Sequence, residues 1–535
     1  MKKIFSLIIC ILLFPAKASL GQDEPLVNEN KSGLYAKSVE QVLQLDPDEV
    51  DLGTAALIIS ERWSDSVHGR RYLSKLDDMA IEIRARLKAQ RLPANYQAVT
   101  VINKYLFDEL GFESVPEAND PNDLFLDCVL DRKRGYCLSL SVLYLSLGER
   151  LGLPLYGVVV PGHFFVRYDD GHTRFNIETT SKGGYADDKH YINKFKVPQD
   201  NSDSIYMMNL NKKQTLGCFF NNLGNSYDSV GNTDQALAAL EKAVEINPSL
   251  SEARTNLGNV YLKKDRTEDA IYQYRTALEI NPGDAKTHNN LGNAYVKRDW
   301  LDEAISEYTQ SLKLDPNFTN AYKNLANAYC KRQMFAQAAA QLKQAIALEP
   351  KDSTLYTQSG DVYNQKGDYQ EAISQYKKTL KLKSDSAVAH YGLGVCYNRL
   401  GLVEDEVEAY KKALVIEPDM VAALINLGNV YSKQHKYDEA IELYKKANRI
   451  KPADGTIHYN LGAAYSNMGF YEQAVAEYQR AIELVPTMGD AHTGLGLAFY
   501  KLKKYESARD HIKKAKELGA DIPKDLLAAI EENLR

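Results

Sequence analysis

The sequence predicts two folds in one chain: an α+β N-terminal domain, followed by an all-α solenoid of stacked helix pairs. Three observations lead to this prediction. A pattern of small and aromatic residues repeats every 34 residues from about 217 to 522. Residues 34–210 show no such period, and their helical spacing of apolar residues changes to β-rich runs after Pro154. A chain of 535 residues is also too long for one ordinary domain.

The second half repeats one unit, as in "NLGNVYLKKDRTEDAIYQYRTALEINP" and "NLGNAYVKRDWLDEAISEYTQSLKLDP". A proline closes most units, and it ends a helix because it lacks an N–H and clashes with the preceding turn. These prolines are Pro248, Pro282, Pro316, Pro350, Pro418, Pro452 and Pro486. The period and pattern resemble the tetratricopeptide repeat, a helix-turn-helix unit. We predict nine repeats over 217–522 and a C-terminal capping helix over 523–535.

Each repeat combines small residues with tyrosines, which accounts for 35 tyrosines in the chain against 15 phenylalanines. The small residues are expected where two helices approach closely, and the tyrosines in the core between helices. The small positions are Gly224, Gly258, Gly292, Gly394, Gly428 and Gly462 in the first helix, with Ala236, Ala270, Ala304, Ala338, Ala372, Ala440 and Ala474 in the second. Glu406 replaces this alanine in one unit, and with Ser359 and Ser384 it predicts a less stable region in the middle of the array.

Asparagines recur in pairs three residues apart on the first helix of the repeats. An i, i+3 pair lies on one face of a helix, and in the family that the repeats resemble this face lines the concave groove. Side-chain amides match the donors and acceptors of an extended peptide. The predicted peptide-binding residues are Asn222, Asn225, Asn256, Asn259, Asn290, Asn293, Asn324, Asn327, Asn426, Asn429 and Asn460. The alternative is that these amides only satisfy neighbouring backbone groups.

The first half contains a predicted β-hairpin, "FFVRYDDGHTRFNIETT", with Asp170-Gly171 as its turn signal. A two-residue turn at this position makes residues whose numbers sum to 341 face each other. His163 is then expected directly opposite Glu178, with Asn176 diagonal on the same face. A bulge would change this register.

Three segments in chain order, "GYC", "GHFFVRY" and "FNIETT", resemble the Cys-His-acid order of the transglutaminase-like superfamily, which has a papain-like fold. The surrounding helices are most similar to its SirB-type branch. The resemblance implies Cys137 as nucleophile, His163 as base and Glu178 as the orienting acid, with Asn176 as the alternative orienter. Cys137 is expected at a helix N-terminus, whose dipole stabilises a thiolate. The neighbouring Arg132, Lys133 and Arg134 are expected to add positive potential.

The N-terminal residues "MKKIFSLIICILLFPAKASLGQ" read as an export signal over 1–18, with a positive start, an apolar run and a small-x-small cleavage site. We therefore expect a periplasmic or secreted protein, with a retained membrane anchor as the alternative. The mature chain shows no other candidate membrane span. Five scattered cysteines remain after cleavage, a poor disulfide framework.

The formal charge of −6 and the absence of a long basic block give no indication of nucleic-acid binding. The histidines and cysteines are dispersed, so we expect no metal site. The sequence has no glycine-rich phosphate loop after a strand, so we expect no cofactor. Two functions remain: an exported scaffold whose repeat groove binds a peptide or protein, or a cysteine acyltransferase or protease that acts through a thioester on polypeptides presented by the repeats. The reactivity of Cys137 separates them.

Overall fold

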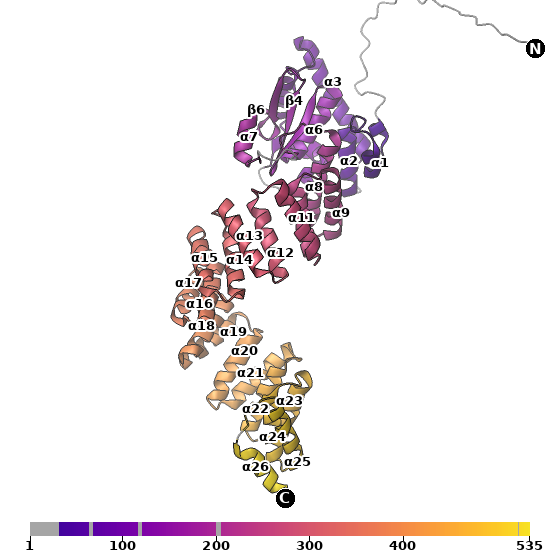
Figure 1. The fold of residues 1–535 in the computed structure, drawn as a ribbon. Helices are drawn as coiled ribbons and strands as arrows, with labels where there is room; N and C mark the ends of the chain where they lie inside the picture. Colours follow the sequence, from indigo (N-terminus) through magenta and orange to yellow (C-terminus); the bar gives the residue numbers. More distant parts are fainter. Residues whose placement is uncertain (1–31, 64–67, 116–119, 199–204, 523, 535) are drawn as a thin grey trace, which may run out of the picture. The chain divides into compact units, whose positions relative to one another are not determined.

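The computed structural model describes residues 32–63, 68–115, 120–198, 205–522 and 524–534. The predicted export signal lies outside these residues. The chain divides into two compact units, residues 1–298 and 299–535. The first unit holds the α+β domain and the first repeat helices, and the second holds the remaining repeats (Figure 1). The predicted fold class, an α+β domain followed by an all-α solenoid, is confirmed.

The α+β domain is built around one buried helix, α6 (Cys137–Leu151). Its sequence is apolar on nearly every face, which is typical of a helix enclosed by other elements. It contacts helices on one side and strands β3 and β4 on the other. A left-handed Gly152 ends α6, as expected from the Gly-x-Pro sequence. The other helices are α1 (Val39–Gln44), α2 (Leu52–Trp63), α3 (Gly69–Gln90), α4 (Ala98–Asn103), α5 (Leu126–Arg132) and α7 (Asp188–Phe195).

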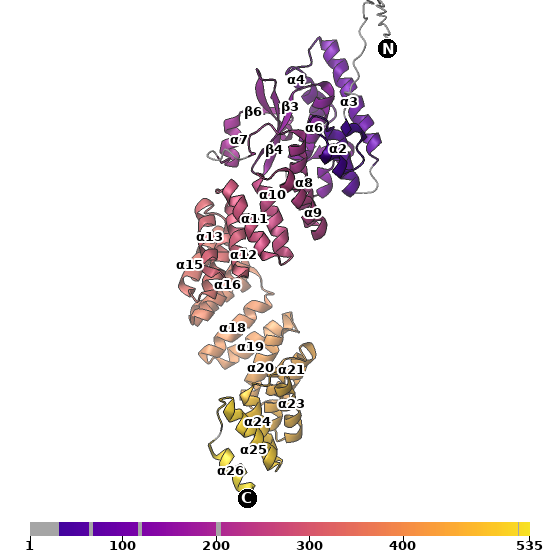
Figure 2. The same ribbon diagram turned by 45° about the vertical axis from the view of Figure 1, so that its right-hand side comes forward.

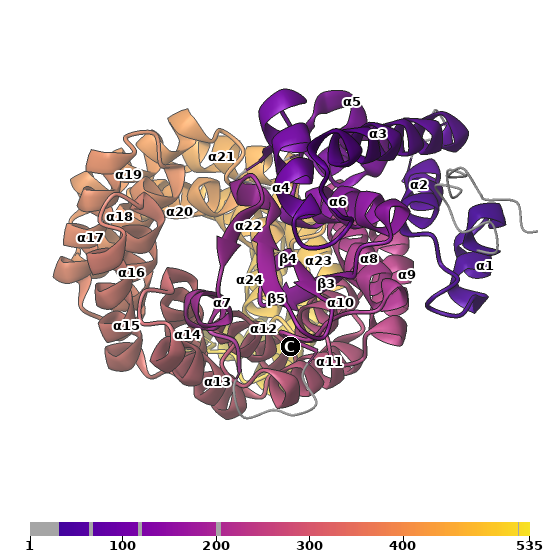
Figure 3. The same ribbon diagram turned by 90° about the horizontal axis from the view of Figure 1, so that it is seen from above.

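Four antiparallel strands form a sheet in the order β3-β4-β5-β6. Their bounds are Leu155–Val160, His163–Asp169, Arg174–Glu178 and Gly184–Ala186. The sheet lies between α6 and α7 (Figure 1, Figure 2, Figure 3). Two short parallel strands, β1 (Glu113–Ser114) and β2 (Arg134–Gly135), pair immediately before α6. This pairing fixes the backbone that leads into Cys137.

The predicted register of the β4-β5 hairpin is wrong by two residues. Asp169 pairs with Arg174, so the numbers of facing residues sum to 343 rather than 341. The connection spans 170–173, because the Asp170 carboxylate accepts hydrogen bonds from the backbone N–H groups of His172 and Thr173 and so stabilises a longer loop. A shift of two residues keeps every side chain on its original face. His163 and Glu178 therefore share a face but are diagonal neighbours.

The repeat array starts with α8, five residues before the predicted boundary. In the first unit its helices are α8 (Lys212–Ser229), α9 (Thr233–Ile246), α10 (Ser251–Lys263), α11 (Thr267–Ile280) and α12 (Ala285–Lys297). In the second unit they are α13 (Leu301–Leu314), α14 (Thr319–Lys331), α15 (Phe335–Leu348), α16 (Ser353–Lys366), α17 (Tyr369–Leu382), α18 (Ala387–Leu400), α19 (Val403–Ile416), α20 (Val421–Lys433), α21 (Tyr437–Ile450), α22 (Gly455–Asn467), α23 (Tyr471–Leu484), α24 (Gly489–Lys501), α25 (Tyr505–Glu517) and α26 (Lys524–Asn533).

Glycine and tyrosine fit together in several repeats as predicted. A Cβ on Gly258 would lie 2.6 Å from a ring carbon of Tyr274, so the paired helices approach closely only because this residue is glycine. Tyr376 lies against Gly360 of its own repeat and Gly392 of the next. At the C-terminal end, α26 covers the last repeat with the buried residues Leu526 and Ile530. Among the described helices, none is long and apolar enough to cross a membrane.

Candidate functional site

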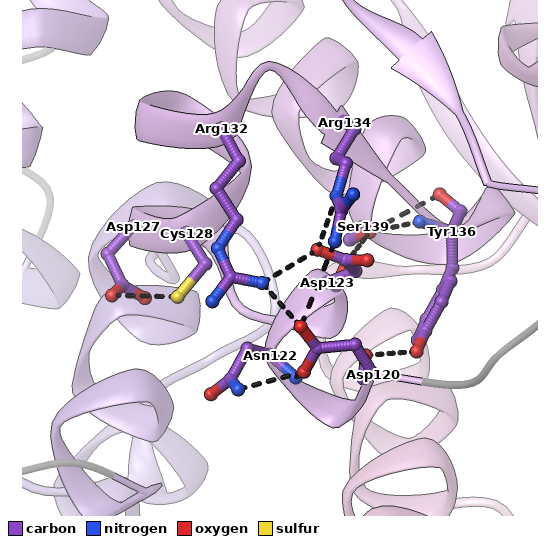
Figure 4. Close-up of polar contacts among 9 residues, drawn as sticks. All are labelled: Asp120, Asn122, Asp123, Asp127, Cys128, Arg132, Arg134, Tyr136 and Ser139. Atoms are coloured by element: carbon purple, nitrogen blue, oxygen red, sulfur yellow. Dashed lines mark hydrogen bonds and ion pairs between the residues drawn. The ribbon is translucent and has the colours of Figure 1, made fainter.

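Cys137 is the first residue of α6, and a polar network around the preceding turn holds it there. The backbone N–H of Tyr136 donates to Ser139 Oγ (2.8 Å), and the Ser139 hydroxyl donates to the Asp123 carbonyl (2.8 Å). The tyrosine hydroxyl donates to the Asp120 carbonyl (Figure 4). A Cβ on Gly135 would lie 2.6 Å from Ser139 Oγ, so this close packing requires glycine. The thiol of Cys137 is half-buried and free.

The two arginines before Cys137, Arg132 and Arg134, do not supply the free positive charge that the sequence suggested. Arg132 donates to Asp120 Oδ2 (2.6 Å) and Asp123 Oδ1 (3.1 Å). Arg134 Nε donates to the same Asp123 oxygen (3.2 Å), as Figure 4 shows. Two carboxylates therefore balance two guanidinium groups. The expectation of added positive potential from these arginines is wrong, because the network uses their charge to hold the turn together.

His163 begins β4 and contacts the carboxylate of Glu178 at the end of β5. The distance from His163 Nε2 to Glu178 Oε2 is 2.7 Å. The other oxygen, Oε1, accepts hydrogen bonds from the backbone N–H (3.1 Å) and hydroxyl (2.5 Å) of Thr180. Tyr191 also donates to Oε2 (3.0 Å). Four contacts therefore orient one carboxylate toward the imidazole, although the longer glutamate replaces the usual aspartate.

Cys137 is the second hydrogen-bonding partner of the His163 ring. Burial alone would lower the pKa of His163, but hydrogen bonds with Cys137 and Glu178, together with their charges, raise it to about 9. Since Nε2 is engaged by Glu178, we assign the contact with the thiol to Nδ1. The ring also stacks on Phe195, with centroids 4.9 Å apart and nearly parallel planes. His163 is thus held between an acid and a thiol, and both neighbours favour its protonated form.

Glu178 remains ionised in this setting. Burial raises the pKa of this carboxyl, but the contacts with His163 and Thr180 outweigh it and lower the pKa to about 2. The residue that follows Glu178 is bonded to α6, because Ser141 Oγ on that helix lies 3.0 Å from Thr179 Oγ1. The elements that carry Cys137 and Glu178 are therefore fixed to each other.

Asn176, the alternative orienter, lies elsewhere. Its Oδ1 accepts from Arg167 Nε (2.8 Å), and its Nδ2 donates to Asp188 Oδ1 (2.7 Å). The corrected register explains this, because Asn176 faces Arg167 directly. This asparagine organises a buried polar cluster beneath α7 instead of contacting His163.

The cavity beside Cys137 has a volume of about 450 Å³ and is lined jointly by the α+β domain and the first repeats. Cys137 and His163 line it from one side. Five of the predicted peptide-binding asparagines line it from α8, α10 and α12: Asn222, Asn225, Asn256, Asn259 and Asn290. All these residues belong to the first compact unit. The candidate catalytic residues and the start of the amide-lined groove thus share one cavity.

The other predicted asparagines lie farther along the array. Asn324 and Asn327 line a separate cavity of about 330 Å³ in the second unit. Asn426 donates to the hydroxyl groups of Tyr391 and Tyr410 (both 3.3 Å), and Asn429 accepts from Tyr444 (2.7 Å). Asn293 and Asn460 are half-buried on their helices and line neither cavity.

Several asparagines bond to each other along the groove. Asn256 Nδ2 donates to Asn221 Oδ1 (2.9 Å), and Asn290 Nδ2 donates to Asn259 Oδ1 (3.0 Å). The predicted alternative, amides that satisfy neighbouring groups, therefore applies to part of these side chains, and Asn259 Oδ1 also accepts from the hydroxyl of Tyr274 (2.8 Å). Asn221 and Glu252 also line the cavity. The sequence pattern missed both, because neither occupies a repeating asparagine position.

The other cysteines differ from Cys137 in their surroundings. Burial raises the pKa of Cys128 to about 12 and that of Cys396 to about 11, and it also raises the pKa values of Cys218 and Cys330. Such thiols are poor nucleophiles. Within the described residues, no group of three or more His, Cys, Asp or Glu side chains is placed to hold a metal ion.

Comparison with known proteins agrees with the division of the chain into an α+β domain and a helical repeat array. A sequence model of the transglutaminase-like superfamily matches residues 70–213. Models of the tetratricopeptide repeat match 221–285 and 459–522, 292–333, 360–401 and 433–469, and 273–306 and 409–442. The chain therefore carries a transglutaminase-like domain followed by an array of tetratricopeptide repeats.

Individual relatives cover only parts of the chain. A UPF0162 protein of Xylella fastidiosa is 26% identical over 220 residues, which are 39% of this chain and 76% of that protein. A UPF0162 protein of Pseudomonas aeruginosa is 25% identical over 195 residues, which are 36% of this chain and 71% of that protein. Among solved structures, YrrB, described as a TPR protein with an unusual peptide-binding site, is 27% identical with a TM-score of 0.31. The match covers 35% of this chain and 96% of YrrB.

Proposed function

We propose that this protein binds an extended polypeptide in the groove of its first repeats and presents it to Cys137 for acyl transfer through a thioester. The observation that carries the proposal is the shared cavity. Cys137 and His163 line it together with five repeat asparagines. Amide side chains offer paired donors and acceptors to a peptide backbone, and a nucleophile beside them meets whatever backbone or side-chain amide they hold.

The Cys-His-Glu arrangement supports a definite sequence of bond changes. The Cys137 thiolate attacks the carbonyl carbon of a substrate amide and forms a C–S bond. As the tetrahedral intermediate collapses, the C–N bond breaks and His163 delivers its proton to the leaving nitrogen. Water or an amine then attacks the thioester carbonyl, and His163 takes up the proton of this second nucleophile. Breaking the C–S bond releases the acyl product and restores the thiolate.

The first turn of α6 supports stabilisation of the oxyanion. The N–H groups at the start of a helix have no acceptor within that helix, and Cys137 and Leu138 are its first two residues. Leu138 also lines the cavity. We assign these two backbone N–H groups to the substrate oxygen, where the positive end of the helix dipole adds to their effect.

The proposal includes export, with residues 1–18 as the signal and a periplasmic or secreted polypeptide as the substrate. The described cysteines are all free of disulfide bonds. In an oxidising compartment, where disulfides form readily, Cys137 must stay reduced to act as a nucleophile. Fusion of the N-terminal 30 residues to a reporter and measurement of its export test this part separately.

The chemistry is tested by trapping the acyl group. The full chain is incubated with a peptide library and hydroxylamine, which converts a thioester to a hydroxamate that mass spectrometry detects. We expect hydroxamates with the wild-type protein and none with Cys137→Ala. Cys330→Ala is the matched control, because it removes a half-buried thiol from the repeats and should leave the yield unchanged. Peptide binding without any Cys137-dependent product would instead identify a binding scaffold on an enzyme's fold.

A further inference from the structure

The turn that precedes His163 has one backbone donor that the sheet does not use. Val160 pairs with His163, so Pro161 and Gly162 form a two-residue connection between β3 and β4. Gly162 has φ of +72°, which fits the third position of a type II turn after proline. Proline has no N–H, and the N–H at this third position lies outside the ladder. His163 follows this turn directly, so the position of the turn determines the position of the His163 side chain.

A glutamate of the second repeat accepts that free donor. Glu252 lies in the first turn of α10, and its Oε1 accepts the Gly162 N–H at 3.2 Å. Its other oxygen, Oε2, accepts from the hydroxyl of Tyr206, which also lies 2.7 Å from Ser251 Oγ. Both oxygens of one carboxylate are therefore used, and the N-terminus of a helix favours a negative charge at this position.

The segment that carries Tyr206 is itself attached to the sheet. The backbone N–H of Met207 donates to the Val159 carbonyl (3.1 Å), and that of Leu210 donates to the Gly157 carbonyl (2.9 Å). Residues 207–210 thus run antiparallel to β3, away from the turn, and Tyr206 precedes them at the end nearer the turn. Glu252 closes the arrangement by joining a repeat helix, this segment and the turn. Burial raises the pKa of Glu252, in keeping with a carboxyl enclosed between these elements.

We propose that Glu252 is a positioning residue for His163, and that the second repeat thereby completes the acyl-transfer site. Glu252, Gly162, His163 and Cys137 all line the cavity of about 450 Å³. The inference rests on the proposed function. It adds that the repeats do more than bind substrate, because they hold the base of the transglutaminase-like domain in reach of the thiol.

The test uses Glu252→Ala and Glu252→Gln in the full chain, with Glu472→Ala as the control. Glu472 is also a first-turn glutamate, but it is exposed on α23. Amide hydrogen exchange is followed in peptides that cover 160–168. Loss of a hydrogen bond to a charged group predicts exchange about tenfold faster at the turn in Glu252→Ala. Glu252→Gln keeps an acceptor oxygen and should exchange like the wild type. Unchanged exchange in Glu252→Ala would overturn the assignment.

A second readout separates positioning from simple stabilisation. Hydrogen exchange at Cε1 of each histidine ring, followed across pH by mass spectrometry, reports the pKa of His163. We expect Glu252→Ala to lower the pKa of His163, because the ring moves away from Cys137 and Glu178. Glu252→Gln keeps the acceptor oxygen and should leave the pKa at its wild-type value. Tyr206→Phe, which removes only one hydroxyl, should give a smaller shift in the same direction. A His163 pKa that stays the same in Glu252→Ala would show that the contact does not position the base.

The two sets of experiments distinguish a failure of the acyl-transfer proposal from a failure of the positioning role of Glu252. If the wild-type protein forms no thioester and the His163 pKa still responds to Glu252→Ala, the acyl-transfer proposal fails and the positioning role stands. If thioesters form in wild type and Glu252→Ala alike, with identical His163 titration, the positioning role fails alone.

Discussion

Replacing Glu178 by glutamine is expected to lower the pKa of His163 in a way that the structure makes quantitative. Three influences act on this ring: burial lowers the pKa of His163, while Cys137 and Glu178 each raise it, to about 9 in total. Glutamine keeps the size of the side chain and removes its charge. A hydrogen bond to a charged group contributes roughly 1.5–3 kcal/mol, and one pKa unit corresponds to about 1.4 kcal/mol. Glu178→Gln should therefore lower the pKa of His163 by about 1–2 units.

The same reasoning orders a set of variants. Cys137→Ala removes the other partner, whose hydrogen bond and charge also raise the pKa of His163. This variant should therefore lower the pKa of His163 as well. In the double variant only burial remains, so the pKa of His163 should fall below the 6.5 of an unperturbed histidine.

Exchange at the Cε1 hydrogen of the ring measures each histidine separately in the full chain. His390 on α18, in the second compact unit, is the internal control, because burial and not the Cys-His-Glu site sets the direction of its pKa shift. Its value should be the same in all variants. A His163 pKa unchanged by Glu178→Gln would refute the assignment of Glu178 as the orienting acid, and a double variant that titrates above 6.5 would refute the account of the three influences.

Three further predictions concern the repeats. Asn256→Ala, Asn290→Ala and Asn324→Ala combined should weaken polypeptide binding about tenfold or more, since each lost amide contact costs about 1 kcal/mol; equal affinity by titration calorimetry would exclude the groove. The array should remain folded with a somewhat lower unfolding midpoint, because Asn256 and Asn290 also donate hydrogen bonds to asparagines of the preceding repeat. Glu406→Ala should raise the free energy of unfolding by about 1–2 kcal/mol, because Glu406 is buried where other repeats have alanine. Burial raises the pKa of Glu406, so its destabilising effect grows as pH rises through that pKa, and the gain should be larger at pH 8 than at pH 4; exposed Glu404→Ala should show neither effect. Gly258→Ala should destabilise the array by about 1–3 kcal/mol through the contact with Tyr274, whereas Gly283→Ala, with its nearest neighbour atom at 3.6 Å, should be tolerated in the same thermal unfolding assay.

Much of the fold was predictable because it depends on local patterns. The 34-residue period, with Gly258 against Tyr274 and a proline after most second helices, is repeated often enough to exclude chance. α6 and the strands after it follow from spacing and from the Gly152 stop signal. The contact of His163 with Glu178 was also expected, because an error of two residues in register preserves the face of a strand.

What the sequence did not predict depends on contacts between distant segments. The charges of Arg132 and Arg134 look free in the sequence and are balanced by Asp120 and Asp123 only after folding. Asn176 is drawn to Arg167 by the register of β4 and β5. Glu252 looks like an ordinary first-turn glutamate, and its contact with Gly162 spans 90 residues of sequence. No local signal reports such a contact.

The most direct test of the central claim is the alkylation rate of Cys137 by iodoacetamide across pH, mapped by mass spectrometry in wild type and His163→Ala. The account predicts that Cys137 is modified faster than the other four described thiols, whose pKa values burial raises. Modification of Cys137 should be slower in His163→Ala, while the other four thiols stay slow in both proteins. Slow modification of Cys137, with the pH profile of an ordinary thiol and no response to His163→Ala, would contradict a Cys-His-Glu acyl-transfer site.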